Sequence, residues 1–216
     1  VFDAARAVDE ANPGSNVIRN RLNGLTRANS VFASEVYEVM PLLHVSVSAR
    51  YNSARVAIRD LRVFSAPNLD GDHRYRKLNP ALGFTWRVAD PVTAYGGVSQ
   101  GNRAPSPIEL GCADRANPCT LPNAMASDPF LKQVDARTIE AGFRGRSEGN
   151  LAWNAGVYRT DSRDDILFVG TTTSSGYFTN FGRTRRQGVE LGLGAAQARS
   201  NWNMQYSLLR EIGRAH

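Results

Sequence analysis

Apolar and polar side chains alternate at every second position through much of this sequence. The pattern is clearest in five segments: residues 45–52, 82–88, 138–144, 188–194 and 201–208. Successive side chains of a β-strand point to opposite faces, so this alternation predicts strands with one apolar and one polar face. Two further segments follow the rule less cleanly, 92–101 and 151–158, and segment 30–40 is strand-like without a clear phase. We therefore expect an all-β chain with about eight strands.

The connections between these segments fall into two classes. Short ones are expected at 41–43, 89–91, 147–150 and 196–200, and long ones at 60–73, 101–135 and 160–176, with 1–28 as the end of another. An antiparallel meander with short turns at one end and long loops at the other is the layout of a transmembrane β-barrel. A soluble β-sandwich has no physical reason to sort its loops in this way. The sorting favours part of a membrane barrel, with a soluble sandwich binding module as the alternative.

Hydropathy and charge are compatible with a membrane barrel. Mean hydropathy is −0.37, and no segment holds the roughly 18 consecutive apolar residues of a membrane helix. A barrel crosses with strands whose alternate side chains face the lumen, so its mean hydropathy stays moderate. The net charge of +6 comes mainly from arginine. It is scattered over strands and loops rather than gathered on one face, which disfavours nucleic-acid binding.

The three tryptophans share one position relative to the turns. Trp86, Trp153 and Trp202 each lie within a few residues of a predicted short turn, on the apolar phase of their strand. Tryptophan is enriched where a membrane meets water, because its ring is apolar and its N–H is polar. We predict an aromatic girdle of outward-pointing rings at one level. Three core tryptophans of a sandwich are the alternative.

Two cysteines lie in the longest predicted loop. Cys112 and Cys119 would be outside the cell if the long loops are extracellular, and that compartment is oxidising. We predict a disulfide, which would contribute roughly 2–3 kcal/mol by constraining the unfolded chain. Free thiols and a zinc site are the alternatives, although zinc needs about four ligands and no histidine or third cysteine is near.

One short motif suggests chemistry. Residues 97–101 read Gly-Val-Ser-Gln-Gly, the pattern of a serine hydrolase in which Ser99 would be the nucleophile. That motif must turn from a strand into a helix, and Pro105 and Pro107 soon after it oppose a helix. The histidine after the serine that a catalytic triad needs would have to be His216. We predict no catalytic residue, no metal site, no cofactor and no enzyme activity.

From about residue 75 onward, nine short segments follow one another with a definite order and spacing: 78–83, 95–101, 103–105, 109–110, 128–129, 131–132, 138–144, 164–166 and 180–193. In these segments the chain resembles the C-terminal barrel of TonB-dependent outer-membrane receptors. Segment 31–52 fits an earlier strand pair. The resemblance implies a barrel of about 22 strands closed by an N-terminal plug, of which residues 1–210 would be a partial barrel. Residues 211–216 resemble a translated sequencing adapter, so we expect a non-native tail.

The resemblance also implies a function. The complete protein would import a ferric siderophore, or a similar small cargo, across the bacterial outer membrane, with outer-membrane lipid and the TonB energising complex as partners. We expect cargo contacts in the long loops and on the polar strand phase, with Arg103, Glu140 and Arg144 as candidates. A passive porin is a further alternative, because a barrel without a plug keeps an aqueous channel.

Overall fold

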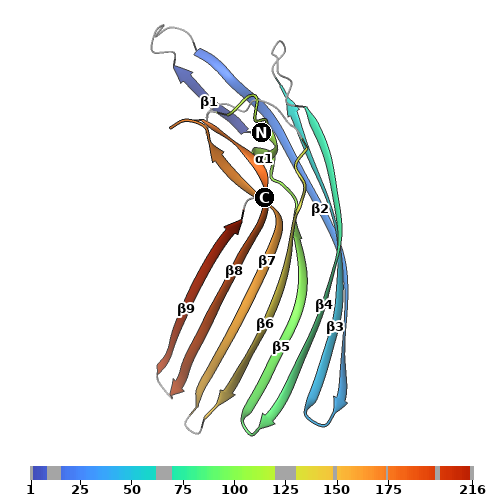
Figure 1. The fold of residues 1–216 in the computed structure, drawn as a ribbon, viewed down its shortest axis with the longest axis vertical. Helices are drawn as coiled ribbons and strands as arrows, with labels where there is room; N and C mark the ends of the chain where they lie inside the picture. The colour runs from blue at the N-terminus through green and yellow to red at the C-terminus, as the bar shows by residue number, and fades with distance from the viewer. Residues whose placement is uncertain are drawn as a thin grey trace.

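The computed structural model describes residues 2–8, 16–61, 70–119, 130–147, 150–173, 175–197 and 200–214. Within these residues the chain forms one open antiparallel sheet of nine strands, in which each strand pairs with its sequence neighbours (Figure 1). The strands are β1 Phe2–Val8, β2 Asn16–Met40, β3 Leu43–Asp60, β4 Gly71–Ala89, β5 Val92–Arg103, β6 Val134–Arg146, β7 Leu151–Gly170, β8 Gly176–Gln197 and β9 Ser200–Arg214. A single described helix, α1 (Pro107–Gly111), lies between β5 and β6.

The predicted meander is confirmed. The strand ends joined by the four short connections (β2 to β3, β4 to β5, β6 to β7 and β8 to β9) all lie at the lower end of the sheet in Figure 1. Connections 61–70 and 104–133, both at the opposite end, were predicted as long loops. Because β1 and β9 pair on one side only among the described residues, the sheet is a section of a barrel and not a closed one.

Two of the predicted long connections are wrong. β7 and β8 continue through most of 160–176 and leave only 171–175 between them, and β2 begins at Asn16 within the segment expected to be a loop. Within the first of these segments, Arg163 of β7 is directly opposite Arg183 of β8. Both side chains are exposed, so charged residues continue the ladder beyond its apolar part. β1 is the ninth strand and was not predicted.

Several strands are longer than a membrane crossing requires. β2 has 25 residues and β8 has 22, whereas about 9–11 tilted residues cross the hydrocarbon core. A strand rises about 3.4 Å per residue, so these strands project well beyond that thickness. The projecting ends lie on the long-loop side of the sheet (Figure 1).

β9 also includes part of the expected non-native tail. The strand continues to Arg214, and Glu211 lies 2.8 Å from Arg186 in an ion pair with β8. Residues 215–216 lie outside the described residues. The non-native origin of 211–216 stays a prediction, and sequencing the native coding region past codon 210 tests it.

Candidate functional site

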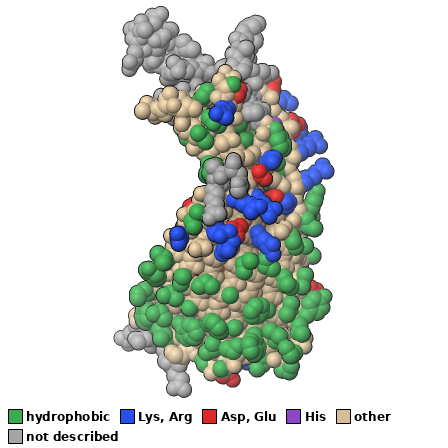
Figure 2. Space-filling view, in the orientation of Figure 1, with side chains coloured by type: hydrophobic (Ala, Val, Ile, Leu, Met, Phe, Trp, Pro, Cys, Tyr) green, Lys and Arg blue, Asp and Glu red, His purple; other side chains and the backbone are tan. Residues whose placement is uncertain are grey.

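The strand register separates two chemically different faces. One row of directly opposed residues is apolar: Trp86, Ala94, Phe143, Ala155, Leu191 and Tyr206. The adjacent row, displaced by one residue, is mostly polar or glycine: Thr85, Tyr95, Gly142, Gly156, Glu190 and Ser207. We call the first the apolar face and the second the polar face. Side chains of the apolar face form a broad band over the lower half of the sheet (Figure 2).

Large side chains of the apolar face are exposed. Phe143 is 51% exposed, Tyr206 58% and Leu208 57%. An exposed apolar surface of this extent is the signature of contact with lipid or with a partner. The register also puts Trp86, Trp153 and Trp202 in the phase of this face, near the short turns.

The polar face is covered at its long-loop end. α1 packs against β2, β3 and β8, and its Leu110 is fully buried. Leu110 belongs to a cluster that includes Val56 and Ile58 of β3, Tyr75 of β4 and Ile166 of β7. The β5–β6 connection thus lies across the upper part of the polar face and contacts strands that are far apart in the sheet.

A capping box sets the position of α1. The Ser106 hydroxyl accepts a hydrogen bond from the Glu109 N–H, and the Ser106 N–H donates to the Glu109 carboxylate at 2.7 Å. This reciprocal pair satisfies helix N–H groups that would otherwise lack partners. Arg103, at the end of β5, donates two hydrogen bonds to the same carboxylate, at 2.8 and 3.0 Å. Burial alone would raise the pKa of Glu109, but the hydrogen bonds from Arg103 and Ser106 lower it below its ordinary value.

A disulfide links two points of the β5–β6 connection, each of which is hydrogen-bonded to the start of β8. Cys112 and Cys119 are bonded, with Cα atoms 5.5 Å apart, and both are buried. Cys119 exchanges two backbone hydrogen bonds with Gly176, at 2.8 and 2.9 Å, and the Cys112 carbonyl accepts from the Phe178 N–H. The disulfide therefore holds together the two points at which this connection is attached to β8.

Amide side chains form a network beneath the β5–β6 connection. Asn102 accepts hydrogen bonds from Asn52 and Asn79 and donates to Gln133. Beside them Arg50 donates to Ser30 at 2.7 Å and to Asn52 at 3.0 Å. Arg50, Asn52, Asn79 and Asn102 line a cavity of about 500 Å³. The cavity therefore offers a cation and amide donors, which suits a polar or anionic guest.

The candidate cargo residues are not gathered at one point. Glu140 and Arg144 lie on the polar face of β6, where Glu140 is exposed and Arg144 lies 5.9 Å from the centre of the Tyr95 ring. Arg103 is opposite Val134 at the other end of β6, held by Glu109. The structure brings Glu140 and Arg144 to one face but separates Arg103 from them.

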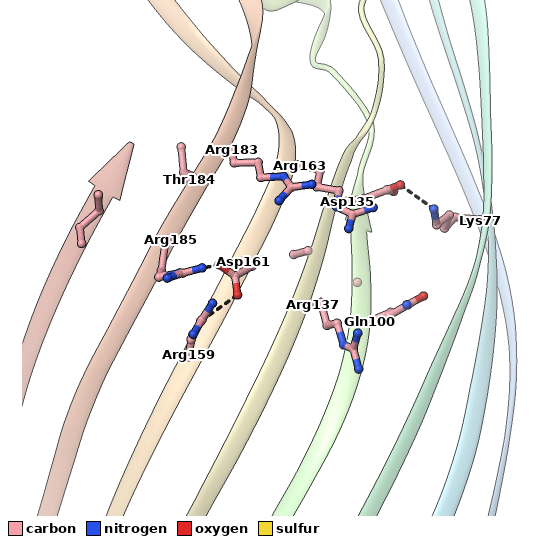
Figure 3. A pocket seen from close by; sticks show the side chains of 13 residues that line it. Lys77, Gln100, Asp135, Arg137, Arg159, Asp161, Arg163, Arg183, Thr184 and Arg185 are labelled. Carbon is pink, nitrogen blue, oxygen red and sulfur yellow. Dashed lines mark hydrogen bonds and ion pairs between the residues drawn. The ribbon is translucent and has the colours of Figure 1, made fainter. Parts of the chain in front are cut away.

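A group of arginines was missed by the sequence reasoning. Five side chains from β6, β7 and β8, named here the arginine cluster, surround a cavity of about 590 Å³ (Figure 3): Arg137, Arg159, Arg163, Arg183 and Arg185. On their own strands they continue the phase of Ile139, Val157 and Val189. That alternation was the signal that could have revealed them.

The Ser99 motif lacks the local geometry of a hydrolase nucleophile. Ser99 lies within β5, opposite Ala81 and Thr138, rather than at a turn from a strand into a helix. No group of three or more His, Cys, Asp or Glu side chains in the described ranges is placed to hold a metal ion. No helix there is long and apolar enough to cross a membrane.

Comparison with known proteins decides the family. The family described as TonB dependent receptor-like, beta-barrel matches residues 2–213. The chain belongs to this family.

Solved structures give the same fold for this receptor barrel. The alcaligin outer membrane receptor FauA of Bordetella pertussis matches with a TM-score of 0.65 and 14% identity, over 90% of this chain and 32% of its own. The copper transporter OprC gives 0.67 and 18% identity, over 89% and 29%. The siderophore receptor PiuA of Acinetobacter baumannii gives 0.64 and 19%, over 88% and 26%. The chain thus spans about a third or less of these structures, and its open sheet is a section of such a barrel.

Membership of this receptor family explains why the sheet has one apolar and one polar face. A receptor barrel in a membrane presents an apolar surface to lipid and a polar surface to its lumen. The apolar face is therefore the outer surface of the receptor, and the polar face with its covering connection lines the lumen. The family and its solved members are receptors and transporters, not enzymes.

Proposed function

We propose that the complete receptor containing this sheet actively imports an iron–siderophore complex across the outer membrane, driven by TonB. The observation that carries the proposal is the polar lumenal face closed at one end by a packed, cross-linked connection. An open aqueous pore needs no such cover, whereas a receptor that captures a scarce cargo does. The siderophore receptor among the structural matches agrees with this choice of cargo.

The amide network beneath the cover is the first place to test for cargo contact. Ferric siderophores are polar and often anionic, and the Arg50 guanidinium can offer two parallel N–H donors to carboxylate or catecholate oxygens. Glu140 and Arg144 lie on the same face farther from the cover and are proposed as further contacts. Arg103 is proposed to act through Glu109, by holding α1 over the site.

The test compares one arginine near the network with one far from it. In the complete receptor, Arg50→Gln should weaken binding of a ferric siderophore by at least about tenfold, since a hydrogen bond to a charged group contributes about 1.5–3 kcal/mol. Arg87→Gln, on the polar face near a short turn, removes the same charge and should leave binding unchanged. Fluorescence titration with iron-loaded and iron-free siderophore measures both.

Energy coupling needs a separate experiment in cells. Uptake of radioactive iron from the siderophore should stop when TonB is deleted and return when it is restored. Uptake that continues without TonB would replace this proposal with the passive-pore alternative. If copper or haem restores growth and the siderophore does not, the transporter class stands and the proposed cargo is wrong.

A further inference from the structure

The arginine cluster lies on the apolar face, on the long-loop side of the lipid-facing band. On β7 the phase of Val157 continues through Arg159 to Arg163, and on β8 the phase of Val189 continues back to Arg185 and Arg183. Figure 2 shows Lys and Arg side chains gathered directly above the hydrophobic band, on the face that carries it. These arginines therefore mark the level at which the lipid-facing surface changes from apolar to cationic.

The charge around this cavity is not balanced within the described chain. Six cationic and two anionic side chains line it. Asp161 accepts from Arg159 at 2.8 Å and from Arg185 at 2.6 Å, and Asp135 pairs with Lys77 (Figure 3). Each carboxylate is thus already in an ion pair. Three cluster members make no ion pair or side-chain hydrogen bond in the described ranges: Arg137, Arg163 and Arg183.

Two of these unpaired arginines are direct neighbours across the ladder. Arg163 of β7 is opposite Arg183 of β8, and like charges directly opposite each other destabilise a sheet. An anion between the two guanidinium groups would replace this repulsion with charge-assisted hydrogen bonds. Phosphate suits the position, because its oxygens can accept two parallel N–H donors from a guanidinium.

The position of the arginine cluster indicates whether it binds the phosphate of a soluble anion or that of a lipid headgroup. A soluble anion would have to reach a surface that continues into the lipid-facing band, whereas a lipid headgroup is delivered to that level by its acyl chains. Basic groups beside a membrane-embedded segment attract anionic headgroups. Exposed Val157 and Val189 on the same strands provide an apolar surface for the acyl chains. We propose that Arg163, Arg183 and Arg137 form a site for the phosphate of an anionic lipid on the long-loop side of the membrane.

The experiment measures lipid binding to the complete receptor after removal of co-purified lipid. The probes are dioleoylphosphatidic acid and dioleoylphosphatidylcholine in mixed detergent micelles, which share acyl chains and differ in headgroup. Native mass spectrometry counts retained lipids, and thermal melting gives an apparent affinity. The test variant is Arg163→Gln/Arg183→Gln, and its matched control is Arg87→Gln/Arg146→Gln, which removes two charges from the polar phase near the short turns.

The proposal makes a quantitative prediction for the pair of variants. Each arginine near an anionic surface contributes about a fivefold factor, so the test variant should bind phosphatidic acid roughly 30-fold more weakly. The control should bind it like the parent. Arg163→Lys/Arg183→Lys should bind it with an affinity between those of the parent and the test variant, because lysine keeps the charge but not the two parallel N–H donors. Without lipid, the test variant should melt no lower than the parent, because the repulsion between the two arginines is gone.

Three results would each overturn the proposal. The first is unchanged phosphatidic acid binding in the test variant when that variant is folded. The second is equal binding of phosphatidylcholine, which would show that the acyl chains alone are recognised. The third is inorganic phosphate binding as tightly as phosphatidic acid, which would make the cluster a site for a soluble anion. None of these results bears on siderophore import.

Discussion

Leu110 provides a direct test of how α1 is held over the lumen. Its side chain is fully buried in the cluster beneath the β5–β6 connection. Replacing a buried leucine by alanine costs about 2–5 kcal/mol, because apolar burial is lost and a cavity remains. For Leu110→Ala we take about 3 kcal/mol, near the lower end, because α1 is a short element at the edge of the cluster and the site can partly relax.

The loss should appear in local opening of the connection and not in unfolding of the whole barrel. Hydrogen exchange of the amides of Leu110, Cys112 and Ala113, which form the hydrogen bonds of this helical turn, reports that opening. A cost of about 3 kcal/mol corresponds to exchange roughly 150-fold faster, since about 1.4 kcal/mol is a factor of ten. Ile108→Ala is the control on the same helix, because Ile108 is 53% exposed and should change exchange little.

One result would refute this reasoning. If Leu110→Ala and Ile108→Ala exchange alike at these three amides, burial of Leu110 does not hold α1 in place. The Arg103–Glu109 pair and the backbone bonds to β8 would then be sufficient.

Three further predictions follow from the same region and from the apolar face. Mass spectrometry of non-reduced, alkylated receptor should find the Cys112 and Cys119 peptides linked, and removing the bond should cost roughly 2.5 kcal/mol of loop-closure entropy; two alkylated cysteines from intact membranes would reject the bond. Because the pKa of Glu109 is lowered in the folded state, its stabilisation is full above an unfolded pKa of about 4.3 and is lost as pH falls through the folded value. Protease cleavage of the connection should therefore increase as the pH falls below about 4.3. A Glu109→Gln variant should lack this increase. Finally, brominated lipid should quench all three tryptophans to a similar depth, whereas unequal quenching would contradict a girdle.

The sequence was most informative where one physical rule governs many residues. Two-residue alternation predicted the meander and its short turns, since each face of a strand meets one environment. The same rule extends through Arg159, Asp161 and Arg163, but the strand was predicted to end near residue 158 and a loop to span 160–176. An outer strand face above the lipid accommodates charges as readily as a loop does, so composition could not separate the two.

The covering of the polar face was only partly predictable. Ser106 and Glu109 have the spacing of a capping box, which is a sequence signal for a helix start and was overlooked. The packing of Leu110 on Val56 and Ile58 has no such signal, because segments some fifty positions apart meet only once the sheet has formed. The hydrogen bonds between Asn102 and Asn79 are of the same kind. Individual amides on neighbouring strands do not reveal from the sequence which of them will meet.

Tyr95 has a consequence for how the strands find their register. Its hydroxyl lies over the glycines of the next two strands, so that a Cβ on Gly142 or Gly156 would come within 2.6 or 2.7 Å of it. A slip of one residue between strands would turn the apolar face toward the lumen. Such a slip would also place Ala141 or Phe143 at the position that Gly142 now occupies beside the ring, where only a glycine leaves room. The Tyr95 ring thus favours one register, because it fits when the three strands are aligned and clashes when they are offset by one residue.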